Sequence, residues 1–250
     1  MGQAEHYDTI LGDYEQHYFD EPSMEYRRQF IYPVLFDKLD LNGKDVVDLA
    51  CASGLNSTEC ARIFPAVRLG GVDISAECCA SYQRHTSYPA RIVDLSSRNA
   101  DIGMACDTAF VVGGLHHCVN DLPATLDNMA RLVKPGGYLL MVEPNAGFLL
   151  NAVREFWYKR DRWFRAQEEH PLHHEKIFAL ASKDFRLVNV HYLGGPAYFL
   201  ILNSLITRFP RWLKPLLAKP LMSLERLYNR LPGSAPYPMF IAQWQRHRDA

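Results

Sequence analysis

The chain of 250 residues is long enough to bury a sizeable core, and its length favours one large domain. Its charge is nearly balanced, with 27 lysines and arginines against 28 aspartates and glutamates, which argues against a general nucleic-acid-binding protein. The six cysteines have neither the spacing of a secreted disulfide scaffold nor that of a zinc ribbon. Because the opening residues, MGQAEHYDTI, also lack the basic start and apolar run of a signal peptide, we expect a reducing cytoplasm.

The charges are unevenly distributed along the chain. Residues 1–40 carry nine acidic side chains against three basic ones, whereas residues 197–231 carry six basic side chains against one acidic one. Since opposite net charges attract, the two segments are expected to pack on each other.

The first clear element is a helix over residues 24–39, MEYRRQFIYPVLFDKL, in which apolar residues recur at helical spacing. Pro33 is expected to kink or break this helix. Asn42-Gly43 then indicates a turn. The apolar run VVDLA (46–50) predicts a buried strand, and STECARIF (57–64) predicts the helix that follows it.

Four further apolar runs follow in order: LGGVDIS (69–75), ARIVDL (90–95), TAFVVGGL (108–115) and GYLLMVEPN (137–145), the last preceded by a helix, DLPATLDNMARLV (121–133). Continuous apolar strands that alternate with helices are typical of a parallel sheet covered on both faces. FRLVNVHYL (185–193) and PMFIAQWQ (238–245) are expected to pair antiparallel at one edge. The predicted fold class is therefore α/β, with a seven-stranded, mostly parallel sheet.

Ligands of such sheets bind at the carboxyl ends of the strands, where Asp48, Asp73, Asp94 and Gly113 fall. The small residues after the first strand follow the pattern A-x-A-x-G, and not the G-x-G-x-x-G of a dinucleotide site. An acid at the strand end repels phosphate but suits a ligand with an ammonium group.

The stretch DLACASG (48–54) resembles the first motif of the class I S-adenosylmethionine-dependent methyltransferases. Asp73, Asp94-Leu95 and the later segment LVKPGGYLLMVEP also match that family in order and spacing, over roughly residues 40–145. The resemblance implies a Rossmann-like fold, a small-molecule acceptor, S-adenosyl-L-methionine as cofactor and S-adenosyl-L-homocysteine as product.

The same resemblance implies the roles of individual residues. Asp73 would accept both ribose hydroxyls, while Asp94 would accept from the adenine amine and Leu95 would pack on its ring. At the N-terminus, a helix that closes over the cofactor would bring its side chains to the methionine carboxylate. The expected cofactor-binding residues are Tyr14, Tyr18, Arg28, Asp48, Ala50, Ala52, Gly54, Asp73, Ile74, Asp94, Leu95 and Gly113.

Alternatives stand beside these assignments. Asp48 and Asp73 could instead cap the helices that follow, and Asp94, followed by Leu-Ser-Ser, could form a plain turn. Ala52 stands where the family usually has a glycine. If that position needs a positive φ, alanine is strained there by about 1 kcal/mol.

Methyl transfer is an in-line displacement, so positioning of the acceptor supplies most of the catalysis. A hydroxyl or amine acceptor must also lose a proton, for which histidine is suited near pH 7. GGLHHC (113–118) offers His116 and His117, of which His117 is expected to face the ligand while His116 packs locally. EEHPLHHEKIF (168–178) offers His174 as a further candidate base. Its histidine spacing is not that of a known zinc signature, so no metal is expected.

The basic segment 197–231 is expected to be a helical insertion, broken into short helices by Pro210, Pro215 and Pro220. It is too polar and too interrupted to span a bilayer of ~30 Å. The favoured interpretation is a lid or a homodimer face, and the alternative is a surface that meets a membrane or an acyl chain.

The whole chain is expected to form one domain, with cofactor-covering helices over 1–40, a cofactor-binding core over 41–145 and an acceptor-side region over 146–250. The hypothesised activity is methyl transfer to oxygen or nitrogen of a small, partly apolar acceptor, such as a natural-product or lipid-like intermediate. Alternatives are a non-catalytic binding subunit of the same fold, a thioether, thiol or carbon acceptor served by positioning alone, and a nicotinamide oxidoreductase.

Overall fold

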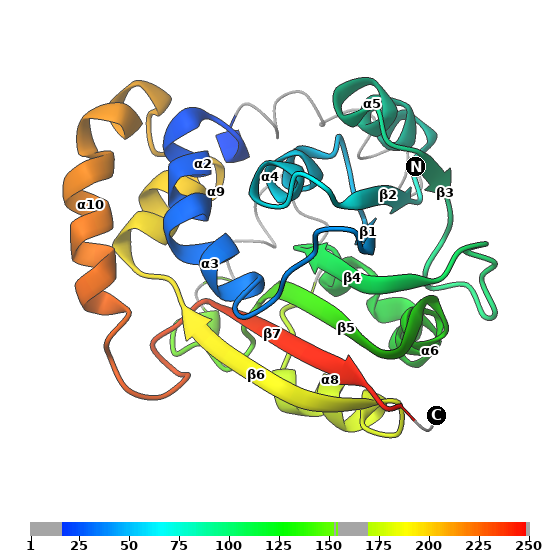
Figure 1. Ribbon diagram of the computed structural model, residues 1–250. Helices are drawn as coiled ribbons and strands as arrows, with labels where there is room; N and C mark the ends of the chain where they lie inside the picture. Colours follow the sequence, from blue (N-terminus) through cyan, green and yellow to red (C-terminus); the bar gives the residue numbers. More distant parts are fainter. Residues whose placement is uncertain (1–16, 153, 155–169, 249–250) are drawn as a thin grey trace.

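The computed structural model describes residues 17–152, 154 and 170–248, and its centre is a seven-stranded sheet of order β3-β2-β1-β4-β5-β7-β6 (Figure 1). The first five strands are parallel, and β7 runs antiparallel to both β5 and β6. The predicted fold class and the antiparallel edge pair are confirmed. The strands are β1 (Asp45–Leu49), β2 (Arg68–Asp73), β3 (Ala90–Ile92), β4 (Cys106–Val112), β5 (Val133–Pro144), β6 (Phe185–Leu193) and β7 (Met239–Arg246).

The central strands bury apolar side chains on both faces. Phe110 and Leu140 belong to one core cluster, whereas their neighbours Val111 and Met141 belong to the other. Successive side chains of a strand point to opposite faces, so a strand buried on both sides has no polar alternation. This is why these strands are continuous apolar runs in the sequence.

Helices cover both faces, as predicted. Residues of α4 (Leu55–Ile63) pack into the first core cluster, and residues of α6 (Leu122–Leu132) and α8 (His174–Ala181) into the second. α5 (Ala76–Thr86) lies between β2 and β3 in the chain. The start of α5 is fixed by Ser75, whose side chain accepts from the amide of Cys78, and that of α6 by Asp121, which accepts from Ala124. Short 3-10 turns, η2 (Leu115–His117) and η3 (Val119–Asp121), connect β4 to α6.

The N-terminal helix is interrupted near Pro33, as predicted. It consists of α2 (Glu21–Tyr26), a π-helical turn η1 (Arg27–Ile31) and α3 (Tyr32–Leu35), with Pro33 at the start of α3. A proline lacks the amide that would continue the regular hydrogen bonding, and the preceding turn widens.

The insertion between β6 and β7 contains η4 (Tyr198–Leu202), α9 (Ser204–Thr207), η5 (Arg211–Leu213) and α10 (Lys214–Tyr228). The prediction that Pro220 would end a helix is wrong, because α10 is 15 residues long and Pro220 lies in its interior. Lys214, Ala218, Met222 and Glu225 are buried on one face of α10. Tertiary packing of that face outweighs the local cost of the proline.

The insertion packs on the N-terminal helix, which confirms the expectation from their opposite charges. The buried Lys214 Nζ donates to Asp20 Oδ2 at 2.8 Å, to the His17 carbonyl at 2.6 Å and to Ser23 Oγ at 3.0 Å. Near the C-terminal end of α10, Glu225 Oε1 accepts a hydrogen bond from Tyr26 Oη at 2.6 Å. In the part of the chain that the structure describes, no helix has the length and apolar character needed to cross a membrane.

Candidate functional site

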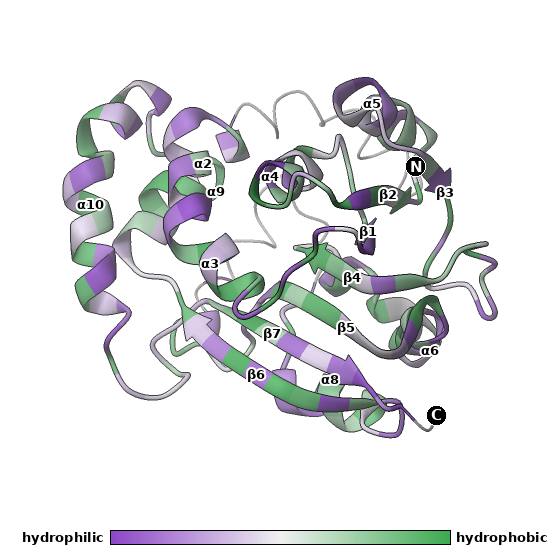
Figure 2. Ribbon diagram, viewed as in Figure 1, coloured by the Kyte–Doolittle hydropathy of each residue, from purple (hydrophilic) through white to green (hydrophobic). Residues whose placement is uncertain are grey.

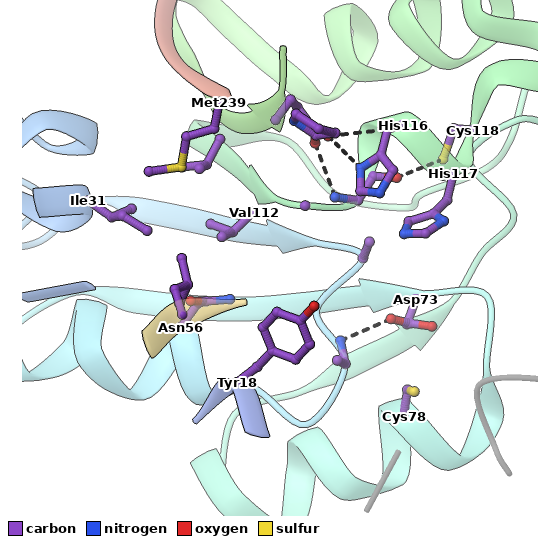
Figure 3. Close-up of a pocket in the computed structure, with 18 of the residues that line it drawn as sticks. Tyr18, Ile31, Asn56, Asp73, Cys78, Val112, His116, His117, Cys118 and Met239 are labelled. Carbon is purple, nitrogen blue, oxygen red and sulfur yellow. Dashed lines mark hydrogen bonds and ion pairs between the residues drawn. The ribbon is translucent and has the colours of Figure 1, made fainter. Parts of the chain in front are cut away.

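A cavity of about 250 Å³ opens over the carboxyl ends of β1, β2, β4 and β5 (Figure 3). Its walls come from the loops that follow those strands, from the N-terminal helix and from the insertion between β6 and β7. The N-terminal helix and the insertion therefore close over the edge of the sheet where the sequence predicted a ligand site.

The loop after β1 has small residues because its backbone adopts left-handed conformations and because the loop after β4 packs close against it. Ala50 has φ of +53°, Ala52 of +46° and Gly54 of +83°. A Cβ atom on Gly114, in the neighbouring loop after β4, would lie 2.5 Å from the Cβ of Ala50. Ala52 thus has the positive φ that strains alanine. This conformation costs an L-residue about 1–2 kcal/mol, and the strained residue lies at the cavity wall.

Asp73 lies at the end of β2 and lines the cavity. Its Oδ2 accepts from the amide of Ala52 at 3.0 Å, and its Oδ1 accepts from the amide of Ser75 at 2.9 Å. Ser75, and not Asp73, caps helix α5. Because each carboxylate oxygen has more than one acceptor site, Asp73 can hold the loop and still accept hydroxyl groups from a ligand.

Asp48 and Gly54 do not belong to the cavity wall. Asp48 is buried and accepts from Ser57 Oγ at 2.7 Å, and burial raises its pKa well above the usual range. Ser57 Oγ in turn lies 2.9 Å from Tyr82 Oη. A Cβ on Gly54 would meet Tyr82 at 2.7 Å. Both residues support the loop from behind.

Four other expected cofactor contacts do line the cavity: Ile74, Asp94, Leu95 and Gly113. Asp94 also forms the turn that the alternative predicted, since its Oδ1 accepts from Ser96 Oγ at 2.6 Å and its Oδ2 from Ser97 Oγ at 2.9 Å. The side chain is therefore fixed by its own turn while it faces the cavity.

On the N-terminal helix, Arg27 faces the cavity in place of the predicted Arg28. Tyr18 lines the cavity, whereas Tyr14 lies outside the described residues. Arg28 is turned away and is held by Glu59 at 2.8 Å and Glu21 at 2.9 Å. Arg27 lines the cavity instead, and it is buried.

The Arg27 guanidinium is placed to receive a ligand. Its centre lies 4.5 Å from the Phe19 ring centroid, and its Nη1 donates to Asn56 Oδ1 at 3.4 Å. Its Nε is buried and has no hydrogen-bond partner among the described residues. A buried donor without a partner costs free energy unless a ligand supplies the acceptor, and a carboxylate fits an arginine best.

Glu143 is a candidate functional residue that the sequence did not reveal. It lies near the end of β5, is fully buried and lines the cavity. Its Oε1 accepts from the amides of Gly114 at 3.1 Å and Leu115 at 2.8 Å, while its Oε2 lies 2.7 Å from His116 Nδ1 (Figure 3). The only sequence signal is a charged side chain within an otherwise apolar strand.

The contact with Glu143 fixes the state of His116. Where Glu143 is ionised, its carboxylate can only accept, so Nδ1 of His116 then carries the hydrogen and Nε2 keeps a lone pair. Burial raises the pKa of Glu143 to about 7, and burial lowers the pKa of His116. The imidazole is therefore neutral near pH 7. Its side chain is 16% exposed, and it lines the cavity.

The other candidate histidines differ in position. His117 lines the cavity beside His116, with 3.9 Å between ring centroids. His174 lies outside the cavity wall, which corrects the expectation that it could act as a base. It is the first residue of α8, is buried against Phe240, and accepts from Trp244 Nε1 at 3.2 Å. Within the described residues, no group of three or more His, Cys, Asp or Glu side chains could hold a metal ion.

Residues 46–137 match a family model described as a methyltransferase domain. The match covers less than half of the chain and lies in the segment whose motifs resemble the class I S-adenosylmethionine-dependent methyltransferases. The matched segment extends from β1 to β5 and contains the loops with Ala52, Asp73, Asp94 and His116.

Solved structures of methyltransferases share this fold over nearly the whole chain. The N-methyltransferase NodS from Bradyrhizobium japonicum WM9, in complex with S-adenosyl-L-homocysteine, is 12% identical, with a TM-score of 0.59 over 96% of this chain and 98% of that one. The mycolic acid cyclopropane synthase CmaA1, complexed with S-adenosyl-L-homocysteine and CTAB, is 14% identical, with a TM-score of 0.67 over 97% and 96%. The StiE O-methyltransferase domain is 17% identical, with a TM-score of 0.55 over 96% and 82%.

The cavity wall fits S-adenosyl-L-methionine, the cofactor that the resemblance implies. The unpartnered donor of Arg27 suits the methionine carboxylate, and Asp73 has acceptor capacity for the ribose hydroxyls. Asp94 and Leu95 offer an acceptor and an apolar surface side by side for the adenine.

Proposed function

We propose that this protein transfers the methyl group of S-adenosyl-L-methionine to an oxygen or nitrogen atom of a small, partly apolar acceptor, such as a natural-product or lipid-like intermediate. The observation that carries the proposal is the pair formed by His116 and Glu143 on the cavity wall. When bound, the cofactor supplies a methyl group on a positively charged sulfur. The NodS and StiE structures, named for N- and O-methyl transfer, agree with this acceptor chemistry.

In this mechanism the chain positions the acceptor and removes its proton. His116 Nε2 takes the proton of the acceptor O–H or N–H as the new bond to carbon forms. The positive charge that develops on the imidazole lies next to the Glu143 carboxylate, which stabilises it through the Nδ1 hydrogen bond at 2.7 Å. The same carboxylate orients the ring, because the amides of Gly114 and Leu115 fix it in turn.

The acceptor side of the cavity is largely apolar. The insertion contributes Tyr198, Leu202, Leu205 and Ile206, and β7 contributes Met239. Asn203 is a polar side chain among them. This composition favours an acceptor that buries a hydrocarbon or ring portion and presents one polar group. The first half of the insertion then serves as the lid over the acceptor.

We further propose that residues 1–250 act as one domain, with the N-terminal helices covering the cofactor, residues 41–145 binding it and residues 146–250 holding the acceptor. The partner is a small molecule and no nucleic acid. All six cysteines are free thiols, which supports a reducing cytoplasm.

Calorimetric titration with S-adenosyl-L-homocysteine tests the cofactor assignment. The protein should bind it, and Asp73→Ala should weaken binding by about 2–3 kcal/mol, the scale of losing hydrogen bonds to a charged group. Arg27→Ala should also weaken binding, while Arg28→Ala is the matched control on the same helix. Absence of binding at millimolar concentration would refute the proposal and favour a non-catalytic subunit, and binding of NADH would indicate an oxidoreductase.

Turnover tests the base. Release of S-adenosyl-L-homocysteine is measured over a panel of small hydroxyl, amine and thiol acceptors. His116→Asn should lower the rate by about 10²–10⁴ with cofactor affinity retained. His117→Asn is the comparison, and a larger loss there would return the role to the residue that the sequence favoured. If both variants keep full turnover, the enzyme works by positioning alone on a thioether, thiol or carbon acceptor.

A further inference from the structure

The outer face of α10 exposes a stripe of leucines. This helix lies at the periphery of the molecule, with α2 between it and the sheet (Figure 1). Leu216 and Leu227 are 68% and 62% exposed, and Trp212, which precedes the helix, is 71% exposed. At roughly 100° per residue, Leu216, Leu224 and Leu227 fall on one side of α10, opposite its buried face, and Leu231 is exposed three residues beyond the helix end.

Basic side chains border this stripe along one flank. Lys219 and Arg226 are exposed, and the same helical geometry places them on one flank of the leucines, while Arg230 is exposed two residues beyond the helix end. Arg226 Nη1 also donates to Gln29 Oε1 on the N-terminal helix at 2.7 Å. Glu225 is the one carboxylate of residues 197–238, and it is fully buried against Tyr26. Figure 2 shows the resulting alternation of polar and apolar bands along α10. We name the five leucines 216, 217, 224, 227 and 231, Trp212 and these three bases the α10 face.

We propose that the α10 face docks on the surface of a membrane that contains anionic lipids. Leucines and an exposed tryptophan beside a row of bases are the arrangement of helices that lie in the membrane interface. The apolar side chains enter the region below the headgroups, and the bases pair with lipid phosphates. No spanning segment is required.

Two other occupants fit the α10 face less well. In a symmetric dimer the same patch meets itself, so Lys219, Arg226 and Arg230 would face a second set of like charges. A nucleic acid would pair with the bases but leave the leucines and Trp212 against water. Of these three occupants, only an anionic bilayer pairs with the bases and also buries the leucines and Trp212.

The α10 face also lies close to the acceptor side of the cavity. Leu205 lines the cavity and also lines a surface hollow whose other walls include Phe209, Trp212 and Pro215. Docking through this face would bring the apolar half of the cavity next to the bilayer. The inference that the acceptor is a lipid-like molecule taken from the membrane rests on the proposed function, whereas membrane binding itself does not.

Co-sedimentation with vesicles tests the docking surface. The full chain should bind vesicles of phosphatidylcholine and phosphatidylglycerol, with a blue shift of Trp212 fluorescence that Trp212→Phe removes, and should bind pure phosphatidylcholine much more weakly. Lys219→Gln with Arg230→Gln should lower the vesicle partition coefficient about 30-fold. Leu216→Ser with Leu227→Ser should lower it at least tenfold. Matched controls elsewhere on the surface, Lys44→Gln with Lys176→Gln and Leu180→Ser with Leu187→Ser, should leave it within twofold.

Several outcomes would overturn the proposal: equal binding to neutral vesicles, an equal loss in the control variants, or full competition by duplex DNA. A wild-type dimer that Leu216→Ser with Leu227→Ser converts to a monomer without vesicles would assign the face to a second copy. Titration with S-adenosyl-L-homocysteine accompanies each variant. Unchanged affinity shows that the fold is intact and keeps this test separate from that of the methyl transfer.

Discussion

Glu143 is the residue that sets the expected pH dependence of methyl transfer. Burial raises its pKa to about 7, so the carboxyl is protonated at lower pH and ionised at higher pH. Only the ionised form stabilises the positive charge that develops on His116. The turnover rate should therefore rise with pH up to about 7 and level off above it.

The variant Glu143→Gln tests this expectation. Its amide oxygen can still accept from His116 Nδ1 but carries no charge, so the rate should fall by about 10²-fold or more and lose its rise with pH. Thermal unfolding and cofactor titration check that the fold is kept. An unchanged pH profile in this variant would show that another group titrates.

Ala52 allows a second test, of backbone strain. With φ of +46°, it occupies a conformation that costs an L-residue about 1–2 kcal/mol, whereas glycine is tolerated there. Glycine also loses about 0.4–1 kcal/mol more through the entropy of the unfolded chain, so Ala52→Gly should stabilise by about 0.5–1 kcal/mol. Urea unfolding measures it. The control Ala130→Gly, within α6, should destabilise by about 1 kcal/mol, and equal losses in the two variants would exclude strain at Ala52.

The sequence predicted cavity-lining carboxylates where they end or follow a strand at a fixed spacing. Asp73 and Asp94 were found because a carboxylate directly after a strand must lie at the sheet edge. Arg27 was not separated from Arg28, because a π-helical turn changes which side chain faces inward. Glu143 was missed because its partners belong to the loop after β4, and pairing across strands leaves no local pattern.

At the scale of elements, strands were predicted most reliably. Each of the seven apolar runs overlaps a strand. For the central strands the cause is burial on both faces, which requires apolar residues throughout, whereas the edge strands β3 and β6 are partly exposed. The error lies in α10, where Pro220 suggested a helix end. Local rules describe a helix in isolation, and the packing of Lys214 and Glu225 against a distant segment is invisible to them.

Glu225 joins three elements, which predicts its effect on stability. Its carboxylate accepts from Tyr26 Oη at 2.6 Å and from the amides of Gly195 at 2.8 Å and Ala197 at 2.9 Å. Glu225→Ala leaves these buried donors without an acceptor and should lower the free energy of unfolding by about 3 kcal/mol or more. Tyr26→Phe removes one donor and leaves both amides with their acceptor, so it should lower the free energy of unfolding by only about 1 kcal/mol. Similar losses in the two variants, measured in urea, would mean that the amides find other partners.

At the scale of the whole molecule, the cavity is closed by two segments that lie far apart in the sequence. Tyr18 and Arg27 come from the N-terminal helix, and Tyr198 and Leu205 come from the insertion. These segments are held together by the buried contacts of Lys214 with Asp20, Ser23 and the His17 carbonyl. Stability of this joint and affinity for the cofactor should therefore be coupled.

Lys214→Ala tests that coupling. It leaves the Asp20 carboxylate and the His17 carbonyl without their cation, and breaking a buried ion pair in this way should lower the free energy of unfolding by about 3 kcal/mol. Because the N-terminal helix that carries Arg27 loses its support, the affinity for S-adenosyl-L-homocysteine should fall about fivefold to tenfold, a loss on the scale of a typical coupling between sites.

The matched control is Lys134→Ala, which removes a lysine that bridges Asp45 and Asp107 at 3.1 Å each and does not line the cavity. That bridge is partly exposed and should cost about 1 kcal/mol or less, with no change in cofactor affinity. Equal affinities for the cofactor in the two lysine variants would show that the N-terminal helix binds the cofactor without help from the insertion.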